Sequence, residues 1–180
     1  MNLPNSLTVF RIFLIPILVV VLLSQFEQKS LIALGIFLIA ALTDMLDGFL
    51  ARRKRQVSVF GQLLDPIADK LLITSTFICL VELNAVSAWM VIVIIGREII
   101  VTGFRGIASS KGIIIPASAL GKIKMDSEIV TIALLILGEK YLGNFYFLAQ
   151  IGLWIVITSA LASALIYFMK YGPKVLSSPS

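Results

Sequence analysis

The sequence contains no histidine, only one cysteine and few charged residues for its length. Without histidine, the chain cannot hold a Ser-His-Asp triad, a histidine general base or a histidine-ligated zinc ion. The single cysteine, Cys79, excludes an internal disulfide, and its position in an apolar run predicts a buried packing role. Acid–base chemistry in this protein must therefore use other groups, and carboxylates are the main candidates.

Charged residues make up 14% of the 180 residues and hydrophobic residues 59%. Because a soluble domain has about 25% charged residues, this composition predicts an all-α integral membrane protein. A single domain, residues 1–180, is expected to contain six transmembrane helices and, between the fourth and the fifth, a re-entrant or surface segment at 112–120. The predicted helices are 4–24, 31–51, 60–82, 86–107, 126–138 with an extension on either side, and 145–169.

Basic residues are concentrated in alternate connections between the predicted helices. Ten of the 15 lysines and arginines lie in residues 52–55, 105–124 and 170–174, whereas the other three connections hold only Lys29 and Lys140. Because basic residues favour the cytoplasmic side of a membrane, both termini are expected in the cytoplasm. The pattern predicts a multi-pass protein of the inner (cytoplasmic) membrane, with residues 52–55 facing the cytoplasm.

Four aspartates lie within or beside apolar stretches of the second and third predicted helices: Asp44, Asp47, Asp65 and Asp69. Ionisable groups inside a membrane are energetically costly and usually functional. Helical residues three or four apart share one face, so two adjacent antiparallel helices could aim all four carboxylates at one point. Such an oxygen-rich site suits Mg2+ or Mn2+, and a pair of these ions can bind a diphosphate. The spacing therefore predicts a metal-dependent active site for a phosphorylated lipid.

Three neighbouring residues lie on the same helix faces as the aspartates. Gly48 and Gly61 carry no side chain and would let a bulky ligand approach the backbone. Arg52, one turn after Gly48, could pair with phosphate oxygens. In the alternative interpretation, the acids are unrelated residues at helix ends, with Asp65 capping a helix that has Pro66 in its first turn. If Pro66 is instead inside a helix, it should kink that helix.

The complete pattern is Asp-x2-Asp-Gly-x2-Ala-Arg-x8-Gly-x3-Asp-x3-Asp, from Asp44 to Asp69. It resembles the motif of the CDP-alcohol phosphatidyltransferases. The resemblance implies a CDP-alcohol phosphotransferase fold with six transmembrane helices, a homodimer and a pair of Mg2+ or Mn2+ ions. It also implies transfer of a phosphatidyl group from CDP-diacylglycerol, or of a phosphoalcohol from a CDP-alcohol.

The resemblance implies roles for the matching residues of this sequence. The metal ligands would be Asp44, Asp47, Asp65 and Asp69. Asp69 would also take the proton from the acceptor hydroxyl, beside Asp65 as the second catalytic aspartate. A carboxylate is the proton acceptor that the chemistry favours here, because histidine is absent. The nucleotide and diphosphate pocket would be lined by Gly48, Arg52 and Gly61.

Three stretches outside this motif, 2–11, 96–105 and 121–124, resemble the bacterial phosphatidylglycerophosphate synthases, a subgroup of the family. The acceptor would then be sn-glycerol 3-phosphate, and the products phosphatidylglycerophosphate and CMP, in phospholipid biosynthesis. A phosphorylated acceptor requires cationic groups. The candidates for binding its phosphate are Arg97, Arg105, Lys122 and Lys124. Glu98, seven residues before Arg105, could orient that arginine.

Polar residues of the first predicted helix are candidates for the donor site. Asn5 and Thr8 lie within a turn or two of Arg11, which is inside an apolar stretch. We expect these residues to contact the nucleotide or diphosphate of the donor, although Asn5 could instead cap the first helix.

The stretch after Lys124 departs from the subgroup, which usually continues with threonine and later a glutamine. Here Asp126 and Glu128 add two acids near the predicted phosphate site. We predict that Asp126 caps the fifth helix and that Glu128 lies in its first turn, where the helix dipole favours an acid. Lys124 itself could instead hold an anionic lipid headgroup.

Other functions are compatible with parts of this pattern. Within the family, the acceptor could be serine, inositol phosphate or phosphatidylglycerol. An intramembrane prenyltransferase also uses aspartates and Mg2+, but those enzymes are larger and have a motif that is absent here. A divalent-cation transporter is the alternative from another class; it would show repeated halves, which this sequence lacks. No nucleic-acid partner is expected.

Overall fold

A computed structural model describes residues 3–54, 59–113, 115 and 119–177. At 3–5, 44–54, 59–63, 119–123 and 176, it describes the helical backbone but not the side chains.

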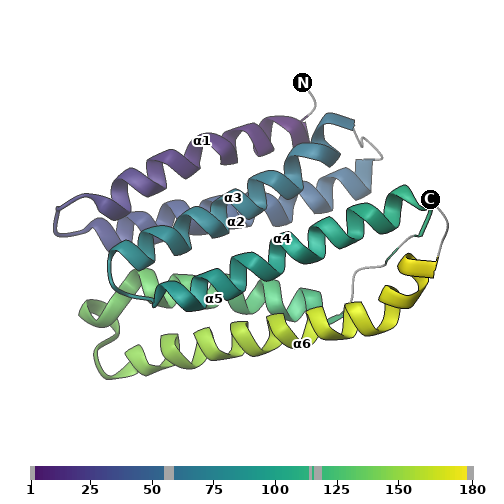
Figure 1. The fold of residues 1–180 in the computed structure, drawn as a ribbon. Coiled ribbons are helices and arrows are strands. Elements are labelled where there is room, and N and C mark those ends of the chain that lie inside the picture. The colour runs from purple at the N-terminus through teal and green to yellow at the C-terminus, as the bar shows by residue number, and fades with distance from the viewer. Residues whose placement is uncertain (1–2, 55–58, 114, 116–118, 178–180) are drawn as a thin grey trace. The chain divides into compact units, whose positions relative to one another are not determined.

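The described chain is helical, with six α-helices, one short 3-10 helix and no strands (Figure 1). The elements are α1 (Leu3–Leu23), α2 (Lys29–Lys54), α3 (Val59–Glu82), α4 (Ala88–Ser110), α5 (Ala119–Leu142), the 3-10 helix η1 (Gly143–Tyr146) and α6 (Phe147–Ser177). All six predicted helices are confirmed as helices. The largest differences are at the end of α6, which continues to Ser177 instead of ending at 169, and at the start of α5. Helix α5 begins at Ala119, so that the end of the predicted re-entrant segment is helical.

Part of the described chain is apolar enough to cross a membrane. Among the described residues, two stretches pass a test of length and hydropathy: Ser6–Leu23 in α1, with a mean hydropathy of 2.6, and Lys124–Val175 in α5 and α6, with 2.0. Large apolar side chains also lie on the protein surface. Phe13 is 67% exposed and Ile92 is 69% exposed. Apolar residues around the whole circumference of a helix are typical of helices that face lipid.

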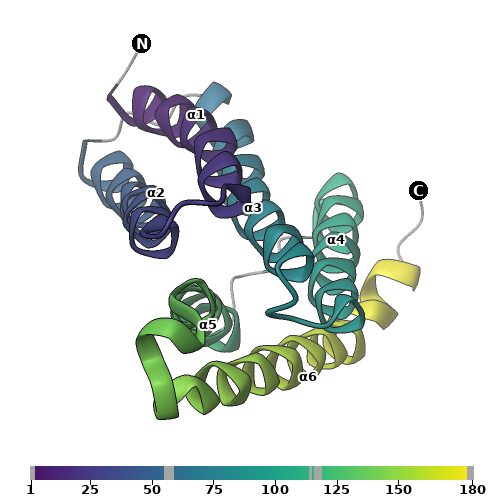
Figure 2. The same cartoon turned by 90° about the vertical axis from the view of Figure 1, so that its left-hand side faces the viewer.

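Helices α1, α2 and α3 pack against one another in the first of two compact units (Figure 2). This unit comprises Met1–Val86 and Ile132–Tyr146. Its fully buried apolar side chains come from all three helices and include Leu18, Phe37, Leu72, Phe77 and Leu80. Cys79 is buried and free, which confirms its predicted packing role. The packing holds α3, which carries Asp65 and Asp69, against α1.

The predicted cap at Asp126 is wrong, and the alternative caps at Asn5 and Asp65 do not form either, because an N-cap must precede the first residue of its helix. Asn5 lies inside α1, and Asp65 lies six residues after the start of α3. Pro66 is therefore inside α3, where its missing N–H removes one helical hydrogen bond. Asp126 lies seven residues after the start of α5, so Glu128 is not in the first turn either.

The second compact unit comprises Ser87–Thr131 and Phe147–Ser180, and α4 packs against α6 within it. A buried apolar cluster joins α4, Ile115 and α6: Val101, Ala108, Ile115, Tyr167 and Val175. Beside this cluster, the rings of Phe104 and Phe168 meet edge to face, with their centroids 5.0 Å apart. This packing fixes the register of α4 against α6, and both helices contribute to the polar cluster described below.

Helices α5 and α6 approach each other closely at Gly152. A Cβ atom there would lie 2.5 Å from Thr131 Oγ1 and 3.2 Å from Thr131 Cβ. We therefore expect Gly152→Ala to destabilise the protein by about 1–3 kcal/mol, as overpacking does. Thermal unfolding in detergent measures the change. Gly35→Ala in α2 is the matched control, because a methyl group there meets no atom within 4 Å. A Gly152→Ala variant that melts at or above the wild-type temperature would contradict this account of the contact.

Candidate active site

The four aspartates lie in two neighbouring helices, at matching distances from the connection between α2 and α3. Asp44 is ten residues before the end of α2, and Asp69 is ten residues after the start of α3. Asp47 is seven residues before the end of α2, and Asp65 is six residues after the start of α3. Because α2 and α3 contact each other and a helix rises 1.5 Å per residue, the aspartates form two levels, about 10 and 15 Å from the α2–α3 connection.

The side chains of Asp44 and Asp47 lie outside the described residues, so the convergence of the four carboxylates stays a prediction. The same is true of five other residues of the predicted site, whose backbones are helical and whose side chains are not described: Asn5, Gly48, Arg52, Gly61 and Lys122.

Asp65 is oriented by a residue of α1. Thr8 donates a hydrogen bond from Oγ1 to Oδ1 of Asp65, across 57 positions of sequence. Thr8 is buried, whereas Asp65 and Asp69, one turn apart on α3, are only partly buried. A hydroxyl that holds one carboxylate oxygen leaves other lone pairs of the carboxylate for a cation. The donor set fits a hard divalent cation, because it offers accessible carboxylate oxygens with a hydrogen bond that fixes their direction.

Arg11 lies three residues after Thr8 on α1, so the two side chains share one face of that helix. Arg11 has no exposed surface and is the largest fully buried side chain among the described residues. Because a guanidinium stays charged under all ordinary conditions, its burial gives this face of α1 a permanent positive charge. That charge agrees with the predicted contact between this part of α1 and an anionic donor.

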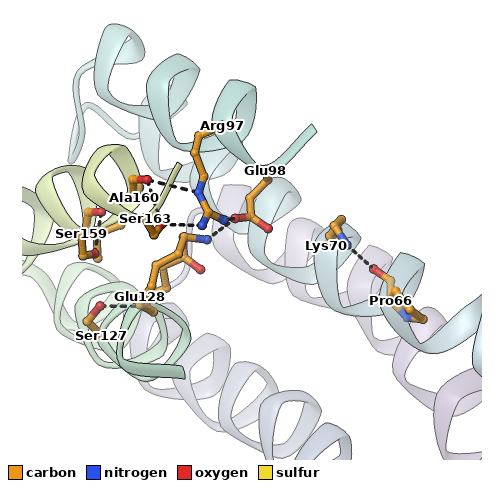
Figure 3. A network of polar contacts seen from close by, with 11 residues as sticks. Pro66, Lys70, Arg97, Glu98, Ser127, Glu128, Ser159, Ala160 and Ser163 are labelled. Carbon is orange, nitrogen blue, oxygen red and sulfur yellow. Dashed lines mark hydrogen bonds and ion pairs between the residues drawn. The ribbon is translucent and has the colours of Figure 1, made fainter. Parts of the chain in front are cut away.

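A second polar cluster lies in the other compact unit, between α4, α5 and α6 (Figure 3). Glu98 Oε1 accepts hydrogen bonds both from Arg97 Nη1 and from Lys124 Nζ. Lys124 Nζ also pairs with Glu128 Oε1, 2.8 Å away and one turn further along α5. The side chains of Arg97, Lys124 and Glu128 are at most 10% exposed, whereas that of Glu98 is 26% exposed.

Arg97 is anchored to α6 as well. Its Nε donates a hydrogen bond to the Ala160 carbonyl oxygen at 3.3 Å, and its Nη2 donates to Ser163 Oγ at 2.5 Å. The serine hydroxyl in turn donates to the Ala160 carbonyl oxygen at 2.9 Å. Figure 3 shows the guanidinium of Arg97 between Glu98 and these two residues. The contacts hold the plane of the guanidinium in one orientation.

The structure brings together two of the predicted acceptor-site residues, Arg97 and Lys124, which share one carboxylate oxygen. Arg105 lies eight residues after Arg97, about 12 Å along α4, and its Nη2 donates to the Ile115 carbonyl oxygen at 3.3 Å. The prediction that Glu98 orients Arg105 is wrong. The carboxylate of Glu98 is instead bonded to the adjacent arginine and to a lysine of α5.

Sequence analysis did not identify Glu128 and Ser163 as members of this cluster. The sequence contained a signal for Glu128, because an acid four residues after Lys124 can pair with that lysine on one helix face. The sequence contained no signal for Ser163, since the hydroxyl of a serine in an apolar helix can form its hydrogen bond within that helix. Only the packing of α4 against α6 brings Ser163 to Arg97.

Comparison with known proteins identifies the family of this chain. A family model described as CDP-alcohol phosphatidyltransferase matches residues 1–166. The chain belongs to the CDP-alcohol phosphatidyltransferase family, and it is a transferase.

Several relatives carry the name CDP-diacylglycerol–glycerol-3-phosphate 3-phosphatidyltransferase. One from Bacillus subtilis (strain 168) is 39% identical, over 94% of each chain. One from Rickettsia felis is 34% identical, over 93% of each chain. One from Salmonella choleraesuis is 37% identical, over 85% of this chain and 90% of the relative. The family match over residues 1–166 spans both the aspartate motif and the residues of the second polar cluster.

Proposed function

We propose that this protein transfers a phosphatidyl group from CDP-diacylglycerol to sn-glycerol 3-phosphate, giving phosphatidylglycerophosphate and CMP. The observation that carries the proposal is the hydrogen bond from Thr8 that orients Asp65, one turn before Asp69, inside the motif of the family. The relatives' names support both substrates, because their similarity covers nearly the whole chain.

The four aspartates would hold two divalent ions, Mg2+ or Mn2+, which would neutralise the diphosphate of the donor and stabilise the departing CMP when bound. The two glycines of the motif, Gly48 and Gly61, leave room for the nucleotide and diphosphate, which Arg52, Asn5 and Thr8 contact. Thr8 has a second role on this account, since its hydroxyl also holds Asp65 in place.

Asp69 is the general base of the proposed reaction. It accepts the proton of a glycerol 3-phosphate hydroxyl, whose oxygen attacks the phosphorus that carries the diacylglycerol. A new P–O bond forms to the acceptor, and the bond from this phosphorus to the oxygen shared with CMP breaks. CMP leaves with the electrons of that bond.

The acceptor's phosphate is bound by Arg97 and Lys124, together with Arg105 and Lys122. The shared carboxylate of Glu98 supports this assignment for the first pair, because it places two cations within reach of one anion. The formal charges of Arg97 and Lys124 are balanced by Glu98 and Glu128. This balance favours a second candidate, a family member whose acceptor is a neutral molecule such as serine.

The proposed architecture is one domain with six transmembrane helices, both termini in the cytoplasm and the active site facing the cytoplasm. Five of the six α-helices have at least the 21 residues of α1, and about 20 are needed to cross a bilayer. The remaining helix, α5, is interrupted at Gly138, whose backbone is not helical. The basic residues support the orientation, and we place the protein in the inner membrane as a homodimer. The test fuses to the C-terminus a reporter enzyme that is active only outside the cytoplasm. Activity of this reporter would contradict the proposed topology.

Release of CMP from CDP-diacylglycerol in detergent tests the proposed function. We expect release with glycerol 3-phosphate and Mg2+ or Mn2+, and its loss when a chelator removes the metal. Serine, inositol phosphate and phosphatidylglycerol are tested in parallel. If serine supports release and glycerol 3-phosphate does not, the second candidate is correct. If no acceptor supports release, the chemistry proposed for this chain is wrong.

A further inference from the structure

The cluster around Glu98 has a composition that is unusual for a site that binds an anion. Two cations and two carboxylates lie within hydrogen-bonding distance of one another, and three of the four side chains are at most 10% exposed. A carboxylate beside a phosphate repels it, so a site with two acids loses affinity unless the acids improve the geometry. The two acids make different contacts, and this difference separates their roles.

Glu98 joins the two cations, whereas the ion pair of Glu128 is with Lys124. Both Arg97 Nη1 and Lys124 Nζ donate to the same oxygen, Glu98 Oε1, and they come from different helices. Without this shared acceptor, the two positive groups would repel each other and separate. The ion pair between Glu128 and Lys124 lies within α5 and does not connect Lys124 to Arg97.

N–H groups remain available for a ligand after these contacts. A guanidinium has five N–H groups, and those of Arg97 make three hydrogen bonds: to Ala160, Glu98 and Ser163. An ammonium has three, and that of Lys124 donates one to Glu98 and forms an ion pair with Glu128. The remaining groups belong to two neighbouring cations, an arrangement that suits the several oxygens of one phosphate.

We propose that Glu98 is a positioning residue, which holds Arg97 and Lys124 side by side so that their remaining N–H groups bind the acceptor's phosphate together. This inference rests on the proposed function, because it assumes a phosphorylated acceptor. Glu128 does not position the pair, and its negative charge only weakens the affinity for an anion. Replacing the two glutamates by glutamine should therefore change acceptor affinity in opposite directions.

The test measures KM for glycerol 3-phosphate, KM for CDP-diacylglycerol and kcat for CMP release with purified protein in detergent. Glu98→Gln should raise the acceptor KM about tenfold, because a charge-assisted contact to each cation is weakened. The donor KM should stay within about twofold. Glu128→Gln is the matched control, with the same loss of one charge beside Lys124, and should lower the acceptor KM roughly two- to threefold.

A third variant removes an anchor of Arg97 without changing any charge. Ser163→Ala deletes the hydroxyl that accepts from Nη2, and should raise the acceptor KM about threefold while the donor KM is unchanged. This variant keeps the proposal testable if Glu98→Gln does not fold. The melting temperature of each variant in detergent shows whether a change in KM accompanies a loss of structure.

The proposal is overturned if Glu98→Gln lowers the acceptor KM as Glu128→Gln does, because both carboxylates would then act only through charge. It is also overturned if Glu98→Gln changes both KM values and the melting temperature together, which indicates a structural role. In either case the wild type would still release CMP with glycerol 3-phosphate, so the proposed function would stand. A wild type inactive with every phosphorylated acceptor would overturn the proposed function and this inference together.

Discussion

Asp69→Asn is expected to lower kcat for CMP release by about a thousandfold, since a general base contributes roughly 10^2–10^4 to a rate. The amide keeps the size of the carboxylate but cannot accept the proton of the acceptor hydroxyl. We expect the variant still to bind CDP-diacylglycerol, because Asp65 keeps its hydrogen bond from Thr8. Single-turnover release of CMP and donor binding, each measured with purified protein, separate these two properties.

Asp126→Asn is the matched control for this variant. Asp126 is an exposed acid on α5, and it has no role in the proposed reaction. The same change of charge there should leave CMP release at the wild-type rate. If Asp69→Asn turns over as fast as this control, Asp69 is not the base.

Arg97→Lys is expected to raise the KM for glycerol 3-phosphate about a hundredfold, although the formal charge of the side chain is unchanged. An ammonium cannot reproduce the planar set of contacts that Arg97 makes to Glu98, Ala160 and Ser163. The remaining N–H groups would therefore no longer be aimed at the phosphate. Measuring the acceptor KM at saturating CDP-diacylglycerol detects the change.

The reverse exchange, Lys140→Arg, is a control outside this cluster. Lys140 is exposed and pairs weakly with Glu27, with an N–O distance of 3.9 Å. We expect this variant to match the wild type in both KM values. An acceptor KM that is likewise unchanged in Arg97→Lys would mean that only the charge at position 97 matters.

The helices and the family could be predicted from the sequence, because both depend on local patterns. Apolar runs long enough to cross a bilayer predicted the bounds of α1–α4 and the start of α6 to within a few residues. The C-terminal end of α6 lies further along the chain than predicted. The start of α5 was predicted only as an extension of unstated length before residue 126, because residues 119–128 contain several polar side chains. In the structure, Lys124 and Glu128 neutralise each other inside the protein, so this polar stretch can be helical and partly buried.

The spacing of the four aspartates also allowed the motif to be recognised, since residues three or four apart on a helix share one face. The spacing of residues in the sequence does not predict that Thr8 donates a hydrogen bond to Asp65, 57 positions away. The prediction that Glu98 orients Arg105 was wrong for a related reason. Its distance along α4 favoured Arg105, whereas α5 brings a lysine from 26 positions away to the same oxygen.

The sequence by itself determined that the chain is helical, that it is apolar enough for a membrane and that it carries the aspartate motif of a phosphatidyltransferase. These properties follow from side chains within one or two helices. Only the tertiary structure decided which residues orient Asp65 and which acid joins Arg97 to Lys124. A buried ionic group takes its partners from whichever helices pack around it, and that packing depends on the whole of each unit.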